Sequence, residues 1–126
     1  MLNVFDKQLI GIKNYNNGLI AERVVYRDYR KNGYSFVKHR LLNSIGEIDL
    51  LFLKNKTLVF IEVKYSIHSE RAYHMINDKK QQKLREAANL YLMENKKTYN
   101  NFEIRFDVAI TCGKNFDLTI YNNVFI

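Results

Sequence analysis

The sequence predicts a single α/β domain in which a mixed β-sheet is flanked by helices. Helical and strand-like patterns follow one another in the order helix, three strands, helix, strand, and a short last strand is expected at a sheet edge. Two apolar runs, residues 48–53 and 58–63, flank a polar turn and are typical of a β-hairpin. A length of 126 residues suits one domain over residues 1–126.

The first helix is predicted over residues 19–31, after a turn-like run rich in asparagine. Ala21, Val25 and Tyr29 recur every four residues and form an apolar stripe along one helix face. Gly33 follows at a position where glycine often ends a helix, because it adopts the left-handed backbone conformation without steric cost.

Three strands are predicted next, over residues 34–42, 47–53 and 57–65. The second and third form the hairpin. The third contains the run Leu-Val-Phe-Ile, which is apolar on both faces and therefore typical of a central strand.

A second helix is predicted to begin at a cap, Asn77 or Asp78, and to run to about residue 94. Strands follow over residues 102–111 and 117–121. A right-handed crossover through the second helix would place the third and fourth strands parallel. The helix is expected to face the sheet with Leu84, Ala87, Ala88 and Tyr91.

Composition excludes several classes of protein. No apolar run approaches the roughly 18 residues of a membrane-spanning helix, and the N-terminus lacks a secretory signal pattern. Cys112 is the only cysteine, which excludes an internal disulfide and a cysteine metal cluster. We therefore expect a cytoplasmic protein that does not enter a membrane. The net charge of +7 favours a polyanionic partner.

Charged residues interrupt the apolar hairpin. Asp49 lies in the first run, and Glu62 and Lys64 stand at the end of the second. Residues opposite each other in a hairpin approach closely, so Asp49 and Glu62 can converge, with Lys64 on the face of Glu62. Two carboxylates suit Mg²⁺ or Mn²⁺, and a neighbouring lysine can orient water or stabilise charge on a phosphate. The pattern indicates metal-assisted phosphodiester hydrolysis, and the alternative is a set of surface ion pairs.

Three blocks in order carry a resemblance to a known family: GEIDLLFLKNKTLVFIEVK at 46–64, KQQKLREAANLYL at 80–92 and RFDVAI at 105–110. They resemble the YraN family of small bacterial proteins, which is assigned by similarity to the PD-(D/E)XK nuclease superfamily and resembles archaeal Holliday-junction resolvases. The resemblance implies a restriction-endonuclease-like core over about residues 18–111. It also implies a metal-dependent DNA endonuclease, with branched or damaged DNA as a candidate substrate.

The resemblance assigns roles by position. Asp49 and Glu62 match the metal-binding acids, with Val63 in the same metal set, and Lys64 matches the catalytic lysine. Glu22 matches an acid on the first helix that approaches the metal site. Together these residues form the implied catalytic centre, with Mg²⁺ or Mn²⁺ as the cofactor.

Nucleic-acid contacts are expected from Lys80, Gln81 and Lys83 on the second helix and from Arg40 ahead of the hairpin. Gln81 shares the inward face of its helix, so it either points towards the carboxylates or caps the helix. Around Arg40 the chain reads Arg-Leu-Leu where the family usually has Asn–aromatic–Arg. Asp107 matches the acid of the third block, where a structural and a catalytic role are both open.

The leading interpretation is therefore an endonuclease acting on DNA. One alternative is a catalytically inactive nucleic-acid-binding module of the same fold, and another is a structural or partner-binding protein. A homodimer would suit a junction-cutting enzyme. His39 has no metal-ligand spacing to cysteine or to other histidines, and His68 and His74 either line the site or lie exposed in the connection before the second helix.

Overall fold

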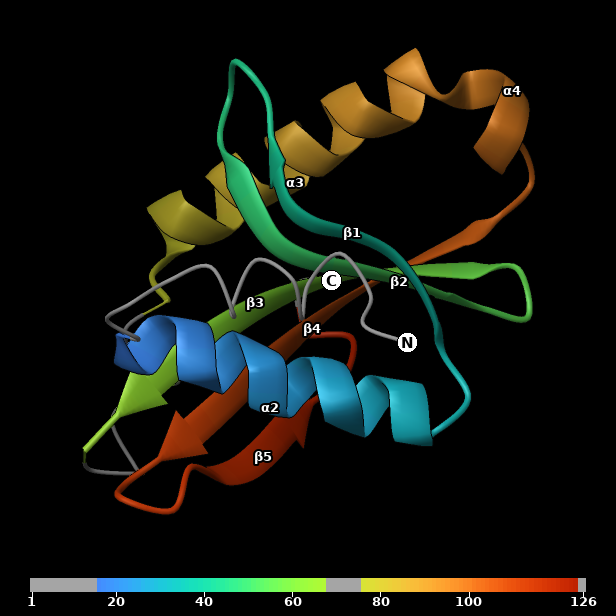
Figure 1. Ribbon diagram of the computed structural model, residues 1–126. Helices are drawn as coiled ribbons and strands as arrows, with labels where there is room; N and C mark the ends of the chain where they lie inside the picture. The colour runs from blue at the N-terminus through green and yellow to red at the C-terminus, as the bar shows by residue number, and fades with distance from the viewer. Residues whose placement is uncertain (1–15, 68–75, 125–126) are drawn as a thin grey trace.

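The computed structural model describes residues 16–67 and 76–124, which form a five-stranded sheet with helices on both faces (Figure 1). The first half contains α2 (Asn17–Lys31), β1 (Ser35–Leu42), β2 (Glu47–Lys54) and β3 (Thr57–Ser66). The second half contains α3 (Asp78–Glu94), α4 (Lys96–Tyr99), β4 (Glu103–Cys112) and β5 (Asp117–Tyr121). The strand order β1-β2-β3-β4-β5 mixes parallel and antiparallel pairs, which confirms the predicted α/β fold class.

β3 is the central strand. It pairs antiparallel with β2 in the predicted hairpin and parallel with β4, from Thr57 opposite Glu103 to Ser66 opposite Cys112. The crossover between β3 and β4 contains α3, as the sequence predicts. β5 pairs antiparallel with β4 and forms one edge of the sheet.

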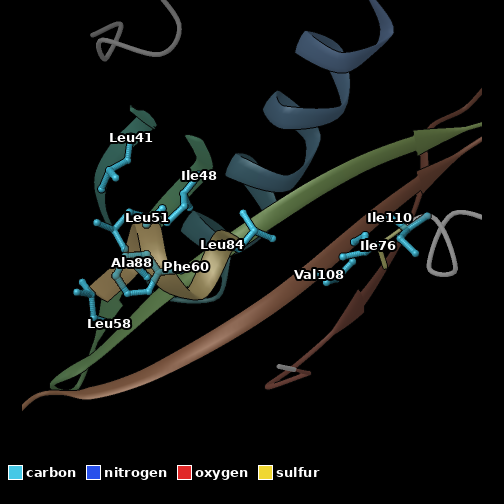
Figure 2. Close-up of a cluster of buried hydrophobic side chains, with 11 residues drawn as sticks. Leu41, Ile48, Leu51, Leu58, Phe60, Ile76, Leu84, Ala88, Val108 and Ile110 are labelled. Carbon is cyan, nitrogen blue, oxygen red and sulfur yellow. The ribbon is translucent and has the colours of Figure 1, made fainter. Parts of the chain in front are cut away.

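Alternation along β3 divides the core into two layers. Leu58 and Phe60 face α3, whereas Val59 and Ile61 face α2. The layer on the α3 side contains side chains of β1 to β4 together with Leu84 and Ala88 of α3. Figure 2 shows these side chains. Because both faces are covered, the hairpin strands are apolar on both sides.

Asparagine side chains fix the starts of both long helices. Asn16 accepts a hydrogen bond from the Leu19 N–H at 2.8 Å, and Asn77 accepts one from the Lys80 N–H at 2.9 Å. Both are standard N-caps, and α2 begins two residues before the predicted start. Gly33 has φ +89° just after α2, so the predicted role for glycine at this helix end is confirmed.

The β1–β2 hairpin is irregular near Asp49. The register shifts between Phe36 and Lys38, so Val37 is an extra residue that forms a β-bulge. Arg40, opposite Asp49 in this register, has φ +53°, a left-handed conformation that is uncommon for arginine.

Between Leu50 and Ile48, the side chains of the hairpin switch from one face of the sheet to the other. Leu41 and Ile48 pack in the layer of α3, although Leu50, only two residues further along β2, packs in the layer of α2. The Asn43 amide donates to the Ala87 carbonyl at 2.9 Å, which fastens the hairpin end to α3 (Figure 1).

Differences from the predicted elements are small. β4 begins and ends one residue later than predicted, and the four-residue α4 lies in a segment predicted as a connection. In the described ranges, the structure contains no helix long and apolar enough to cross a membrane. His68 and His74 lie outside the described residues.

Candidate metal centre

A cleft of about 390 Å³ opens where the second half of β3 meets the start of α3 and the end of the hairpin. The carboxyl ends of parallel strands are a common place for ligand sites. The lining is largely charged and contains three acids and three lysines. The described lining residues are Gly46, Glu47, Asp49, Glu62, Val63, Lys64, Lys80, Lys83 and Leu84.

Asp49 lies on β2 just beyond the last residue that pairs with β3. The pairing of β2 with β3 reaches Leu50 opposite Ile61. One step further, the Asp49 Oδ2 accepts the backbone N–H of Val63 at 2.8 Å. The Asp49 carboxyl is therefore held by the backbone of the central strand, which fixes its orientation in the cleft.

Asp49 and Glu62 form an acid pair, in which the two side chains hydrogen-bond to each other. Burial, followed by the hydrogen bond and negative charge of Glu62, raises the pKa of Asp49 to about 9, although the Val63 N–H acts to lower it. Because burial disfavours a charged carboxyl group and two adjacent carboxylates repel each other, the raised pKa of Asp49 means that the metal-free acid pair holds a proton at neutral pH.

Two lysines lie against the acid pair. The Lys80 Nζ is 3.5 Å from the Glu62 Oε2, and the Glu62 side chain is only 6 % exposed. Burial and the contact with Lys80 lower the pKa of Lys64, against the raising effect of Glu62. Burial acts to lower the pKa of Lys80, but its hydrogen bond with Lys64 and the charge of Glu62 outweigh this and raise it. The ammonium groups of Lys64 and Lys80 therefore interact directly with the acid pair and with each other.

Glu22 approaches the acid pair from α2. Its buried carboxylate lies 2.8 Å from the His39 Nε2 and 3.6 Å from the Arg40 guanidinium. Its charge contributes to the raised pKa of Asp49. Glu22 does not itself line the described part of the cleft, so it would act on Asp49 through its charge.

Arg40 and Gln81, two of the predicted nucleic-acid contacts, have partners within the protein, as Lys80 does at Glu62. The Arg40 guanidinium lies 3.6 Å from Glu22 and 3.9 Å from Glu47. The Gln81 amide donates to the Ile76 carbonyl at 3.1 Å, so Gln81 braces the start of α3, in keeping with the capping alternative. The other two predicted contacts, on α3, line the cleft.

His39 is a neighbour of the site that the sequence pattern missed. Metal-ligand spacing gives no signal for it, because its partner is a carboxylate on α2. The sequence carries only a weaker signal, which is that His39 is a polar residue in a strand and pairs with the buried Leu50. The ion pair of Lys80 with Glu62 was missed as well, because it depends on how α3 docks on the sheet.

Asp107 lies on β4, is fully buried and belongs to a separate polar network. It accepts hydrogen bonds from the Tyr29 hydroxyl at 2.6 Å, from the Arg105 guanidinium at 2.9 and 3.0 Å, and from the Asn123 N–H at 3.0 Å. These contacts join α2, β4 and the segment after β5, and Asp107 does not line the described cleft. Of the two roles open for Asp107, its contacts are those of a structural residue.

The donors in the cleft suit a hard divalent cation that keeps much of its water. Among the described residues, no three His, Cys, Asp or Glu side chains are arranged to hold a metal ion. The acid pair with the backbone at Val63 would leave most coordination positions to water and phosphate. Mg²⁺ is commonly bound in this way, through one or two carboxylates and substrate phosphate, and oxygen donors also suit Mn²⁺.

Comparison with known proteins gives the family. The model of the uncharacterised protein family UPF0102 matches residues 21–111. The chain belongs to UPF0102. UPF0102 is the YraN family, so the resemblance carried by the three sequence blocks is confirmed.

UPF0102 proteins of several bacteria match the chain over most of its length. One from Ruegeria pomeroyi is 36 % identical over 115 residues, which cover 91 % of this chain and 92 % of the relative. One from Vibrio campbellii is 30 % identical over 116 residues, with 84 % and 95 % covered. One from a Marinomonas species is 37 % identical over 97 residues, with 75 % of each chain covered. The span that matches the UPF0102 model contains all the described residues that line the cleft.

Proposed function

We propose that this protein is a Mg²⁺- or Mn²⁺-dependent endonuclease that hydrolyses phosphodiester bonds in DNA. The observation that supports it most directly is the cleft in which Asp49, Glu62 and Lys64 converge. Acids for a hard cation and lysines for phosphate are the combination that this hydrolysis requires. The resemblance to junction resolvases favours branched or damaged DNA as the substrate.

Each residue has a distinct task in this proposal. Asp49 and Glu62, with the backbone at Val63, would hold the cation, which when bound makes water more acidic and offsets phosphate charge. Asp49 releases its proton on becoming a ligand. Lys64 orients the attacking water or stabilises charge on a phosphate oxygen. The water oxygen bonds to phosphorus as it loses a proton, and the bond to the leaving oxygen breaks as that oxygen gains one.

The charge of the protein supports nucleic acid as the partner. The chain has a net charge of +7, and Lys80 and Lys83 line the cleft on α3. Ammonium groups at this position are suited to phosphate oxygens of a nucleic-acid backbone. The three lysines of the cleft do not need a metal ion to bind phosphate. This feature favours a second candidate function, a nucleic-acid-binding module that does not cut.

A cleavage panel tests the two candidates. Single-stranded, duplex, flap and four-way DNA would be incubated with the purified protein, with and without Mn²⁺. We expect Mn²⁺-dependent cutting that falls at least about 100-fold in Glu62→Gln and Lys64→Met. Asp117→Asn, at the exposed start of β5, is the control for a carboxylate change outside the cleft.

The outcomes separate the candidates. Failure of the wild-type protein to cut any of the four substrates would contradict the endonuclease. Tight binding without cutting would identify the binding module. Equal cutting by wild type and Glu62→Gln would remove the acid pair from the proposed chemistry.

A further inference from the structure

Lys80 occupies an unusual place for a lysine. It is the third residue of α3, and its N–H is bound by the cap Asn77. A cation in the first turn of a helix is disfavoured, because the N-terminal end of the helix dipole is positive. Burial also acts against the Lys80 charge, whereas Lys64 and Glu62 favour it. The helix end and burial therefore disfavour this charge, and its neighbours in the cleft compensate for them.

The compensating acid is one of the predicted metal ligands. The Lys80 Nζ lies 3.5 Å from the Oε2 of Glu62. Glu62 is nearly inaccessible to water, whereas Lys80 is 39 % exposed. Lys80 thus supplies positive charge to a buried carboxylate from a side chain that still reaches solvent.

An ammonium group and a divalent cation cannot share this carboxylate closely. A bound Mg²⁺ would lie about 2.1 Å from a carboxylate oxygen, within a few ångströms of the present position of the Lys80 nitrogen. Like charges at such a separation repel strongly in a partly buried site. The long, flexible stem of lysine and the open cleft give the ammonium room to move.

We infer that Lys80 is the resident counter-ion of Glu62, and that a divalent cation binding to the acid pair displaces the Lys80 ammonium, which then binds a phosphate oxygen in the same cleft. The inference rests on the proposed metal site. It assigns Lys80 a second task besides nucleic-acid contact, because the same side chain opposes metal binding in the absence of DNA. Both the metal and the phosphate favour the position in which the Lys80 ammonium has left Glu62. Binding of either one therefore increases the affinity for the other.

Calorimetric titration of the protein with Mn²⁺ alone, at one fixed pH, tests the displacement. Lys80→Met removes the charge and keeps an unbranched apolar stem. We expect it to bind Mn²⁺ at least about fivefold more tightly than wild type. Lys79→Met is the matched control, because it makes the same charge change at the neighbouring exposed position of α3, and it should leave the affinity unchanged.

A second variant and a second readout guard against a folding defect. Lys80→Arg keeps the positive charge and should bind Mn²⁺ with nearly wild-type affinity. Without metal, Lys80→Met should unfold at a lower temperature than Lys79→Met, because Glu62 has lost its counter-ion. At saturating Mn²⁺ the two variants should unfold at the same temperature, because the metal ion then replaces the Lys80 ammonium as the counter-ion of Glu62.

The outcomes distinguish the inference from the proposed function. No Mn²⁺ binding by either wild type or Lys80→Met would overturn both. Mn²⁺ binding that is equal in wild type and Lys80→Met, or weaker in Lys80→Met, would overturn the displacement and leave the metal site standing.

Discussion

Replacing Asp49 with asparagine tests the acid pair in the metal-free protein, before any cleavage is measured. Asparagine has the shape of a protonated aspartic acid. Its side-chain oxygen can accept the Val63 N–H, and its amide can donate to Glu62, in the places where the Asp49 carboxyl now makes these bonds. The substitution therefore removes the capacity to ionise and little else.

The size of the effect follows from the raised pKa of Asp49. Its pKa rises from 3.8 to about 9 on folding. Between these values the folded protein holds a proton that the unfolded chain has released, so the free energy of unfolding falls as the pH rises, by up to about 1.4 kcal/mol per pH unit. From pH 5 to pH 8 the limit is about 4 kcal/mol. Because Asp49 is partly exposed, solvent screening reduces this to about 2 kcal/mol.

Thermal unfolding followed by circular dichroism, in EDTA from pH 5 to pH 8, measures this effect. In a chain of this length about 2 kcal/mol corresponds to about 8 °C in Tm. The advantage of Asp49→Asn over wild type should grow by about this amount between the two pH values, and Asp117→Asn should follow the wild type. Parallel pH profiles for wild type and Asp49→Asn would refute the reasoning. A variant less stable than wild type at every pH would show that Asp49 is a structural ion-pair partner.

Further predictions concern the core, the second polar network and the partner. Asp107→Asn should lower the free energy of unfolding by about 3 kcal/mol, because it leaves the Arg105 charge without its buried partner; urea unfolding with an unchanged midpoint would contradict this. Phe52→Ala should cost about 3–5 kcal/mol and Phe52→Leu less than about 1.5 kcal/mol, since the fully buried ring stacks on Tyr29 at 5.2 Å; equal unfolding midpoints would speak against this packing. Affinity for DNA, measured by fluorescence anisotropy, should fall about 10³-fold between 50 and 200 mM salt, and a constant affinity would remove nucleic acid as the partner.

The sequence was sufficient to predict the elements of the fold because their local signals agree. The stripe of α2 and the apolar runs of the hairpin each have one interpretation, and the two candidate caps of α3, Asn77 and Asp78, are neighbours. The structure places these elements within about two residues of the predicted bounds. The position of α4 was not predictable, because a four-residue helix carries no periodicity of its own.

The acid pair was predictable for a similar reason. The antiparallel register of a hairpin brings Asp49 and Glu62 together whatever surrounds them. The neighbours of the acid pair were not predictable. His39 reaches Glu22 in a strand shifted by the Val37 bulge, and a one-residue shift reverses the faces of a strand. Contacts of this kind depend on tertiary docking, which leaves no spacing in the sequence.

The irregularity of β1 also affects how copies of the protein can meet. β1 is an outer strand, and an outer strand offers its free backbone groups to any other chain, which is a common route to aggregation. The bulge at Val37 and the left-handed backbone of Arg40 interrupt that row of donors and acceptors. The opposite edge, β5, has only five residues. Self-association by extension of the sheet is therefore disfavoured at both edges, so a homodimer that cuts DNA junctions would have to meet through other surfaces.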